Sequence, residues 1–159
     1  MAHLNPNVDA PLSLRVDVNS QTLEILRQGV PEKVYPISTS RFGLGSEPGS
    51  YKTPLGRFLI SDKIGDAAPL GSVFKSRLPT GDVVGEGGEE DLILTRILWL
   101  SGLDPHNANT HDRYVYIHGT NQESLIGTPA SHGCVRMRNQ DVAELYDLVP
   151  EGTPLEIVA

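Results

Sequence analysis

Alternating apolar and polar residues predict several short strands in the first part of the chain. Residues 12–18 (LSLRVDV) and 22–26 (TLEIL) alternate with a period of two and are joined by a short polar link. This pattern predicts a β-hairpin, because side chains of a strand point alternately to its two faces. Residues 33–38 (KVYPIS) predict a third strand. Pro36 cannot donate a ladder hydrogen bond, so this strand is expected at a sheet edge or bulge.

Later apolar stretches predict the rest of a sheet. Residues 57–65 (RFLISDKIG) and the tail 153–159 (TPLEIVA) are expected to be strands. Residues 92–100 (LILTRILWL) are nearly all apolar, and their length and flanking glycines favour a buried strand over one face of a helix. Residues 113–119 (RYVYIHG) alternate around two tyrosines and a histidine and give the clearest strand signal.

One segment has the period of a helix. Four apolar side chains within 142–149 recur at i, i+3, i+4 and i+7, with Asn139 as the expected N-cap and Pro150 beyond the end. Residues 39–56 are too rich in Gly, Ser and Pro for a regular element, and residues 66–90 are expected to be irregular, with an exposed acidic insertion. Six or seven strands with one helix predict a mainly β domain, either a sandwich or a barrel.

Length and charge narrow the function classes. The 159 residues suit a single domain, 1–159, and the net charge of −7 argues against nucleic acid or an anionic membrane as partner. A small or peptidic partner is therefore expected, and the oligomeric state is left open. The first twenty residues hold no basic cluster and no long apolar run, so a cytoplasmic location is expected, or a periplasmic one if a native leader is missing.

The segment TPASHGCVRM contains the only cysteine of the chain, Cys134. A thiolate is favoured by a nearby histidine, here His132, or by a helical turn, which CVRM is expected to begin. The backbone amides of Gly133 and Cys134 are candidates for holding an oxyanion. The alternative is a small buried hydrophobe. Ser131 before the thiol and Arg136 after it are unusual neighbours for a core residue, so the nucleophile is favoured.

A nucleophile needs a base, and His118 is the candidate because it ends the clearest strand and is followed by Gly119. The alternative for His118 is a buried core histidine. His106 and His111 lie in a polar loop and His3 is close to the N-terminus, so no role is assigned to these three.

A zinc site is a further alternative. Its ligands would be His118, His132 and Cys134, with His111 or Asp112 as the fourth. The spacing matches no common zinc pattern, so no metal and no other cofactor is expected.

Three motifs resemble one known family. IHGT at 117–120 and SHGCVRM at 131–137 resemble the signature of the L,D-transpeptidase catalytic domain, also called the YkuD domain. GSYKTPLGRF at 49–58 resembles that family's Thr-Pro-x-Gly segment. The resemblance covers a core of about 12–158. It implies a mainly β fold, a β-sandwich of mixed sheets with one main helix after the catalytic loop.

The resemblance also implies roles for individual residues. Cys134 would be the nucleophile and His118 the base, with the carbonyl of Gly119 orienting the imidazole. Arg136 would either bind a substrate carboxylate or lock the loop, and both alternatives stay open. The residues implied to hold the oxyanion or line the site are Gly133, His132 and Ser131.

In this family the substrate is a peptidoglycan stem tetrapeptide, cleaved between its third residue, usually diaminopimelate, and the terminal D-Ala. The expected enzyme is an L,D-carboxypeptidase of muropeptide recycling, because a chain without an export signal would meet soluble muropeptides and water. The alternatives are an L,D-transpeptidase that forms crosslinks or exchanges D-amino acids, and an inactive wall-peptide-binding module. A carbapenem is expected to acylate Cys134 if the site is active.

Two neighbouring features are expected to be structural. The acidic stretch GEGGEED at 85–91 is expected to be a solvated loop, and Trp99 and Tyr116 are expected to pack in the core rather than line a peptide groove.

Overall fold

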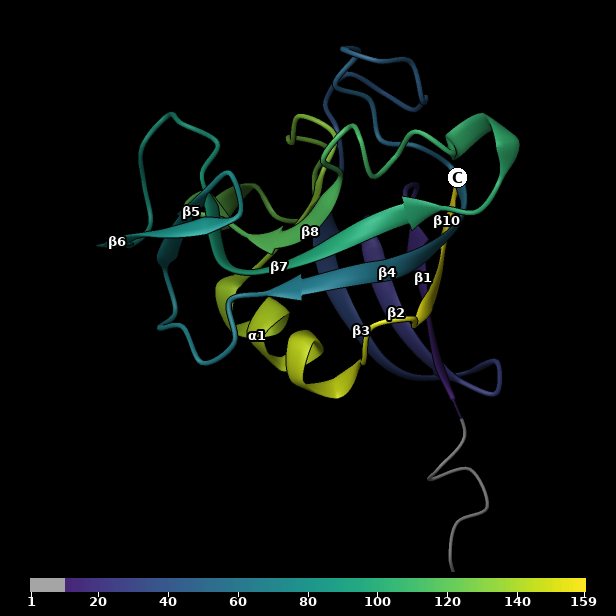
Figure 1. The fold of residues 1–159 in the computed structure, drawn as a ribbon, viewed down its shortest axis with the longest axis horizontal. Coiled ribbons are helices and arrows are strands. Elements are labelled where there is room, and N and C mark those ends of the chain that lie inside the picture. The colour runs from purple at the N-terminus through teal and green to yellow at the C-terminus, as the bar shows by residue number, and fades with distance from the viewer. Residues whose placement is uncertain (1–10) are drawn as a thin grey trace, which may run out of the picture.

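The computed structural model describes residues 11–159, whose strands form one mixed sheet that closes on itself (Figure 1). The strand order is β4-β10-β1-β2-β3-β9-β8-β7-β5-β6, and β4 also pairs with β7. The strands from β4 to β7 in this order therefore make a ring, and the β5–β6 hairpin extends it. The elements are β1 (Leu12–Asp17), β2 (Thr22–Arg27), β3 (Val30–Ser38), β4 (Gly56–Ile64), β5 (Ser72–Lys75), β6 (Leu78–Val83), β7 (Ile93–Gly102), the 3-10 turn η1 (Pro105–Asn107), β8 (Tyr116–Gly119), the 3-10 turn η2 (Glu123–Leu125), β9 (Val135–Met137), α1 (Asn139–Leu148) and β10 (Pro154–Val158).

Two pairs of neighbouring strands are parallel, β1 with β10 and β8 with β9, and all the others are antiparallel. In Figure 1, β4 and β7 lie in front of β1 to β3, and α1 lies below them. The predicted mainly β class with mixed strand directions and one main helix is confirmed.

The core lies inside the ring. The predicted hairpin forms with Leu14 opposite Ile25 and Val16 opposite Leu23, and these four side chains are buried. The helix buries Val142, Leu145 and Tyr146, as its period predicted, and Val149 just past its end packs into the same cluster. Each such side chain contributes about 1.5 to 3 kcal/mol when it is fully buried.

The helix begins differently from the prediction. Asn139 is the first helical residue and not the N-cap, which is Arg138, without a capping side-chain hydrogen bond. The Asn139 side chain is used elsewhere, because its Nδ2 donates to Thr120 O (2.8 Å) and its Oδ1 accepts from Thr95 Oγ1 (2.6 Å).

Within residues 11–159 no helix is both long and apolar enough to cross a bilayer.

Two strand predictions were wrong in extent. The strand expected at 113–119 begins only at Tyr116, because Tyr114 has a φ of 58° and turns the chain. The region expected to be irregular at 66–90 contains the β5–β6 hairpin. Every residue of β6 is exposed, so the strand has no buried face that could produce an alternating pattern.

The prediction for Pro36 was also wrong. Its strand β3 lies between β2 and β9, and Pro36 pairs regularly with Thr22. Ile37 donates its N–H to Gln21 O on the β2 side, so the nitrogen of Pro36 faces the β9 side. The ladder with β9 involves only Ile37 and Ser38, so the missing donor of Pro36 costs no ladder hydrogen bond.

Candidate active site

Two short parallel strands place the candidate catalytic side chains on one face of the sheet. In the β8–β9 ladder Ile117 lies opposite Val135 and His118 lies opposite Arg136. Because side chains alternate along a strand, Cys134, which directly precedes Val135, shares the face of His118 and Arg136. The ladder therefore brings together the two motifs that the sequence singled out.

The thiol of Cys134 is held by backbone groups at and just before the start of β8. Tyr116 N–H donates to Sγ (3.4 Å), and Sγ lies 3.6 Å from Tyr114 O, to which the thiol donates. The residue is half-buried, and the packing of protein around it raises its thiol pKa to about 12. The helical turn expected at Cys134 is absent, because β9 begins at Val135, so no helix N-terminus favours the thiolate. The resting nucleophile is therefore a neutral thiol.

His118 is fully buried and carries its proton on a defined nitrogen. Nδ1 lies 2.5 Å from Gly119 O, and since a carbonyl only accepts, Nδ1–H is the donor. Burial lowers the imidazole pKa, while the charge of Asp91 raises it in part. The resting ring is thus neutral with a lone pair on Nε2, which can accept a proton. Gly119 has no room for a side chain, because a Cβ would collide with Asn139 and Leu94.

Hydrogen bonds from neighbouring segments fix the loop before Cys134. Ser131 Oγ donates to Cys134 O (2.6 Å) and accepts from Gly133 N–H (3.2 Å). Thr53 Oγ1, from the predicted Thr-Pro-x-Gly segment, donates to Gly133 O (3.0 Å). Gly133 has a φ of +117°, which glycine adopts without strain.

This loop geometry changes the expected roles of two residues. Ser131 is fully buried, so it supports the loop instead of lining the site. The N–H of Gly133 is occupied by Ser131 Oγ. Within residues 11–159 the N–H of Cys134 has no hydrogen-bond partner, so this donor is the one free to meet an oxyanion.

Asp91 belongs to this site, and sequence reasoning missed it. Its Oδ2 lies 2.8 Å from His132 Nδ1 and its Oδ1 lies 3.0 Å from Arg136 Nη2. Burial works against the charge of Asp91, yet the positive charge that His118 carries when protonated, the charge of Arg136 and the hydrogen bonds of Arg136 and His132 lower its carboxyl pKa. The expectation that GEGGEED is wholly solvated was wrong for its last residue, which links β9 to the loop of the thiol.

Arg136 is engaged inside the protein. The side chain is 1% exposed, and besides Asp91 it donates from Nη1 to Gln122 Oε1 (3.0 Å). Of the two alternatives left open by the sequence, this geometry favours the loop lock over substrate binding.

Asn121 anchors the acidic stretch that carries Asp91. Its Nδ2 donates to Gly87 O (2.9 Å) and Glu90 O (3.0 Å), and its Oδ1 accepts from Leu92 N–H (3.2 Å). Asn121 lies two residues after the end of β8, so the strand that carries His118 also helps to fix the position of Asp91.

Changing Asp91 to Asn is expected to lower the free energy of unfolding by about 1 to 3 kcal/mol, because the buried Arg136 loses its anionic partner. The charge of Asp91 raises the His118 pKa, so its loss should lower that pKa. The acid limb of the pH–rate profile for the expected tetrapeptide cleavage should then move to lower pH. Urea unfolding and pH-rate profiles measure both effects. Glu90→Gln is the matched control because its side chain is exposed. An Asp91 variant that matches this control in both measurements would contradict the assignment.

The surface at the thiol has a hollow of about 220 Å³ that is lined by three segments of the chain. His132 lies at its rim, where its ring packs against Phe42 (centroids 5.7 Å apart) and Tyr51 (5.9 Å). His132 therefore lines this hollow. The lining residues are Pro48, Gly49, Tyr51, Asp112, Arg113, Tyr114, Val115, His132, Gly133 and Cys134.

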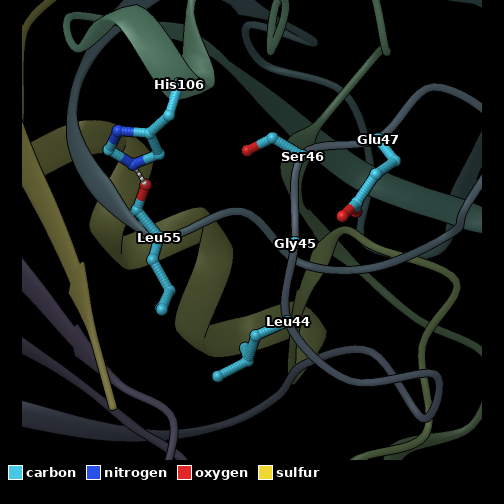
Figure 2. Close-up of a pocket in the computed structure, with 6 residues that line it drawn as sticks. All are labelled: Leu44, Gly45, Ser46, Glu47, Leu55 and His106. Carbon is cyan, nitrogen blue, oxygen red and sulfur yellow. Dashed lines mark hydrogen bonds between the residues drawn. The ribbon is translucent and has the colours of Figure 1, made fainter.

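A larger hollow of about 490 Å³ lies elsewhere and contains neither Cys134 nor His118. Figure 2 shows its lining, in which the His106 ring faces the Leu55 carbonyl, with Nε2 at 2.9 Å. The smaller hollow contains the candidate nucleophile Cys134 and the larger one does not, so the smaller hollow is the candidate active site. The larger one is lined by Leu44, Gly45, Ser46, Glu47, Leu55 and His106.

The remaining histidines support no metal site. His111 stacks on Trp99 (centroids 3.8 Å apart), and its Nε2 lies 3.0 Å from Asp62 Oδ2. His3 lies outside the described residues. Across 11–159 no group of three or more His, Cys, Asp or Glu side chains is placed to hold a metal ion, so the zinc alternative gains no support.

Comparisons with known proteins agree with the motifs. The family model for the L,D-transpeptidase catalytic domain (YkuD) matches residues 12–157. A curated relative, the putative L,D-transpeptidase YkuD of Bacillus licheniformis, is 29% identical over 154 residues, which cover 96% of this chain and 68% of that protein. The chain thus spans about two thirds of the length of this relative.

Solved structures share the fold. An L,D-transpeptidase from Mycobacterium smegmatis superposes with a TM-score of 0.62 at 18% identity, covering 94% of this chain and 59% of that one. L,D-transpeptidase 3 from Mycobacterium tuberculosis, in complex with a faropenem-derived adduct, gives a TM-score of 0.60 at 19% identity, covering 93% and 60%. The chain spans about three fifths of these two structures.

Proposed function

Because the chain belongs to the L,D-transpeptidase catalytic domain (YkuD) family, as its motifs predicted, we propose that it is an acyl-transfer enzyme with Cys134 as nucleophile and peptidoglycan stem peptides as substrates. The observation that carries this proposal is the β8–β9 ladder, which puts Cys134 and His118 on one face of the sheet beside an open hollow. The scissile bond would be the one between the third residue of a stem tetrapeptide and its terminal D-Ala.

The protonation states of Cys134 and His118 at rest favour a thiol attack that is coupled to proton transfer. The thiol and the imidazole are both neutral, so no thiolate–imidazolium pair is formed in advance. In our proposal His118 Nε2 takes the thiol proton while Sγ attacks the carbonyl carbon of the third residue. Gly119 O keeps the proton of Nδ1 in place, so Nε2 stays the accepting nitrogen.

The negative charge would develop on the substrate carbonyl oxygen, where the free N–H of Cys134 can donate. His118 would then give its proton to the leaving nitrogen, so that the C–N bond breaks, D-Ala departs as an amine and a thioester to Cys134 remains. The contacts of Asp91 with His132 and Arg136 would hold the loop still during these steps.

For the second half-reaction we propose water as the acceptor, which makes the enzyme an L,D-carboxypeptidase. Water reaches a half-buried thioester without a binding site of its own, whereas an amine acceptor has to be bound and aligned. Recycling of muropeptides in the cytoplasm is the setting that suits this hydrolysis. Transpeptidation to a second stem peptide, with a periplasmic setting, is the alternative.

Incubation with a purified tetrapeptide muropeptide, followed by mass spectrometry, tests the proposal. We expect tripeptide and free D-Ala. Detection of dimers, or of exchange products formed with an added D-amino acid, would contradict hydrolysis and support transpeptidation. No product of either kind, together with no adduct after exposure to a carbapenem, would overturn the acyl-transfer proposal and favour a binding module. The adduct complex of the M. tuberculosis relative makes a β-lactam a suitable active-site probe.

A further inference from the structure

The turn of the β5–β6 hairpin holds an arginine over aromatic rings next to the thiol. Ser76 and Arg77 have φ values of 48° and 64°, as in a tight two-residue hairpin turn. The guanidinium carbon of Arg77 lies 5.0 Å from the ring centroid of Trp99 and 4.9 Å from that of Tyr114. Its Nη1 donates to Tyr116 Oη (3.1 Å). Three aromatic side chains thus fix the guanidinium.

Arg77, Tyr114 and Tyr116 also line a hollow of about 310 Å³, which we call the Arg77 pocket. Tyr114 lines both this pocket and the hollow that contains Cys134, so the two adjoin across one side chain. Cys134 itself packs against the apolar cluster beneath the pocket. Tyr116 is therefore a buried residue, as expected, whose side chain also lines the pocket. The lining residues are Phe74, Ser76, Arg77, Ile93, Ile97, Tyr114 and Tyr116.

Arg77 uses fewer of its N–H donors within the protein than the two other arginines near the site, because Arg113 donates to Gly45 O, Ser50 Oγ and Lys52 O, and Arg136 donates to Asp91 and Gln122. Within residues 11–159 no carboxylate forms an ion pair with Arg77, although the chain has a net charge of −7. Only one of its five N–H donors is used in a hydrogen bond, so a bidentate edge remains available.

We propose that the Arg77 pocket binds a carboxylate of the stem peptide during acyl transfer. This inference rests on the proposed function and names a recognition element of the same site. A planar guanidinium matches a carboxylate with two parallel hydrogen bonds, and a stacked guanidinium loses little freedom when it binds. Two carboxylates of the substrate qualify, that on the side arm of diaminopimelate at the third residue and that of the terminal D-Ala.

Peptide binding to the Cys134→Ala variant tests the proposal without turnover. Trp99 is the only tryptophan and lies under Arg77, so its fluorescence reports occupancy of the pocket. Three tetrapeptides are titrated, one with diaminopimelate, one with lysine at the third position, and one with diaminopimelate and a terminal amide. The titrations are repeated with the additional change Arg77→Gln, and dissociation constants are compared.

If the pocket binds the side-arm carboxylate, Arg77→Gln should reduce the preference for diaminopimelate over lysine by about tenfold to hundredfold. If it binds the terminal carboxylate, the preference for the free acid over the amide should fall by a similar factor. Lys75→Gln is the matched control, because it removes one positive charge from an exposed position of the same hairpin. Thermal melting of each variant shows that the fold is retained.

Equally weaker binding of all three peptides, or a lower melting temperature with unchanged preferences, would overturn the proposal. Arg77 would then only stabilise the β5–β6 hairpin. Failure of the Cys134→Ala protein to bind any of the peptides would overturn it as well. If the peptides bind with the expected preferences and the unmodified enzyme cleaves none of them, the proposed function fails and the pocket assignment stands.

Discussion

Replacing Cys134 with alanine is expected to remove tetrapeptide cleavage, lowering the rate by at least about four orders of magnitude, as loss of a covalent nucleophile does in other enzymes. The chain has no second cysteine that could take over. The thioester cannot form, so exposure to a carbapenem should add no mass to the protein. Product analysis by chromatography and intact-mass spectrometry measure the two effects.

The alanine variant should keep its fold, because Cys134 is only half-buried and makes weak sulfur hydrogen bonds. We expect a change in the free energy of unfolding of about 1 kcal/mol or less. A stable alanine variant that still releases D-Ala, or that still gains the β-lactam mass, would show that the nucleophile is another residue.

Replacing His118 with asparagine is expected to lower kcat/KM by about two to four orders of magnitude, the usual contribution of a general base. The asparagine amide can still donate to Gly119 O, as Nδ1 does, but it cannot accept the thiol proton. Steady-state kinetics on the tetrapeptide measure the loss. His106→Gln is the matched control, since His106 lines the separate hollow of Figure 2 and should leave the rate unchanged.

The pH profile separates this mechanism from a preformed thiolate. The unmodified enzyme should gain activity as His118 loses its proton, with the acid limb below the ordinary imidazole pKa of 6.5, because burial lowers that pKa. Above this limb the rate should be flat through neutral pH, since the thiol pKa of about 12 keeps the thiolate scarce. The asparagine variant should instead rise steadily with pH. A steady rise in the unmodified enzyme would contradict His118 as the base.

Features that depend on residues close together in the sequence could be predicted. The β1–β2 hairpin follows from strict alternation, because one face of each strand is buried. The helix follows from its apolar period. The two motifs predicted that His118 and Cys134 share a site, and the β8–β9 ladder brings the two segments side by side.

Features that depend on contacts between distant segments could not be predicted. Asp91 lies in a Gly- and Glu-rich stretch, and only its pairing with Arg136 and His132 separates it from the other acidic residues there. Arg77 lies in a hairpin whose second strand is exposed along its length, so no alternation marked it. The high pKa of the Cys134 thiol arises from burial, which the neighbouring residues in the chain do not specify.

The place of β10 has a consequence for how the protein matures on the ribosome. Among the strands of residues 11–159 this one comes last, yet it lies between β1, which comes first, and β4, and without it the ring stays open. Strand β8, which carries His118, and strand β9, which follows Cys134, leave the ribosome earlier, but the sheet around them cannot close until residues 154–158 have emerged. Pairing of such distant segments slows folding. We therefore expect nascent chains stalled before residue 154 to be sensitive to proteases, and resistance to appear only after β10 is released.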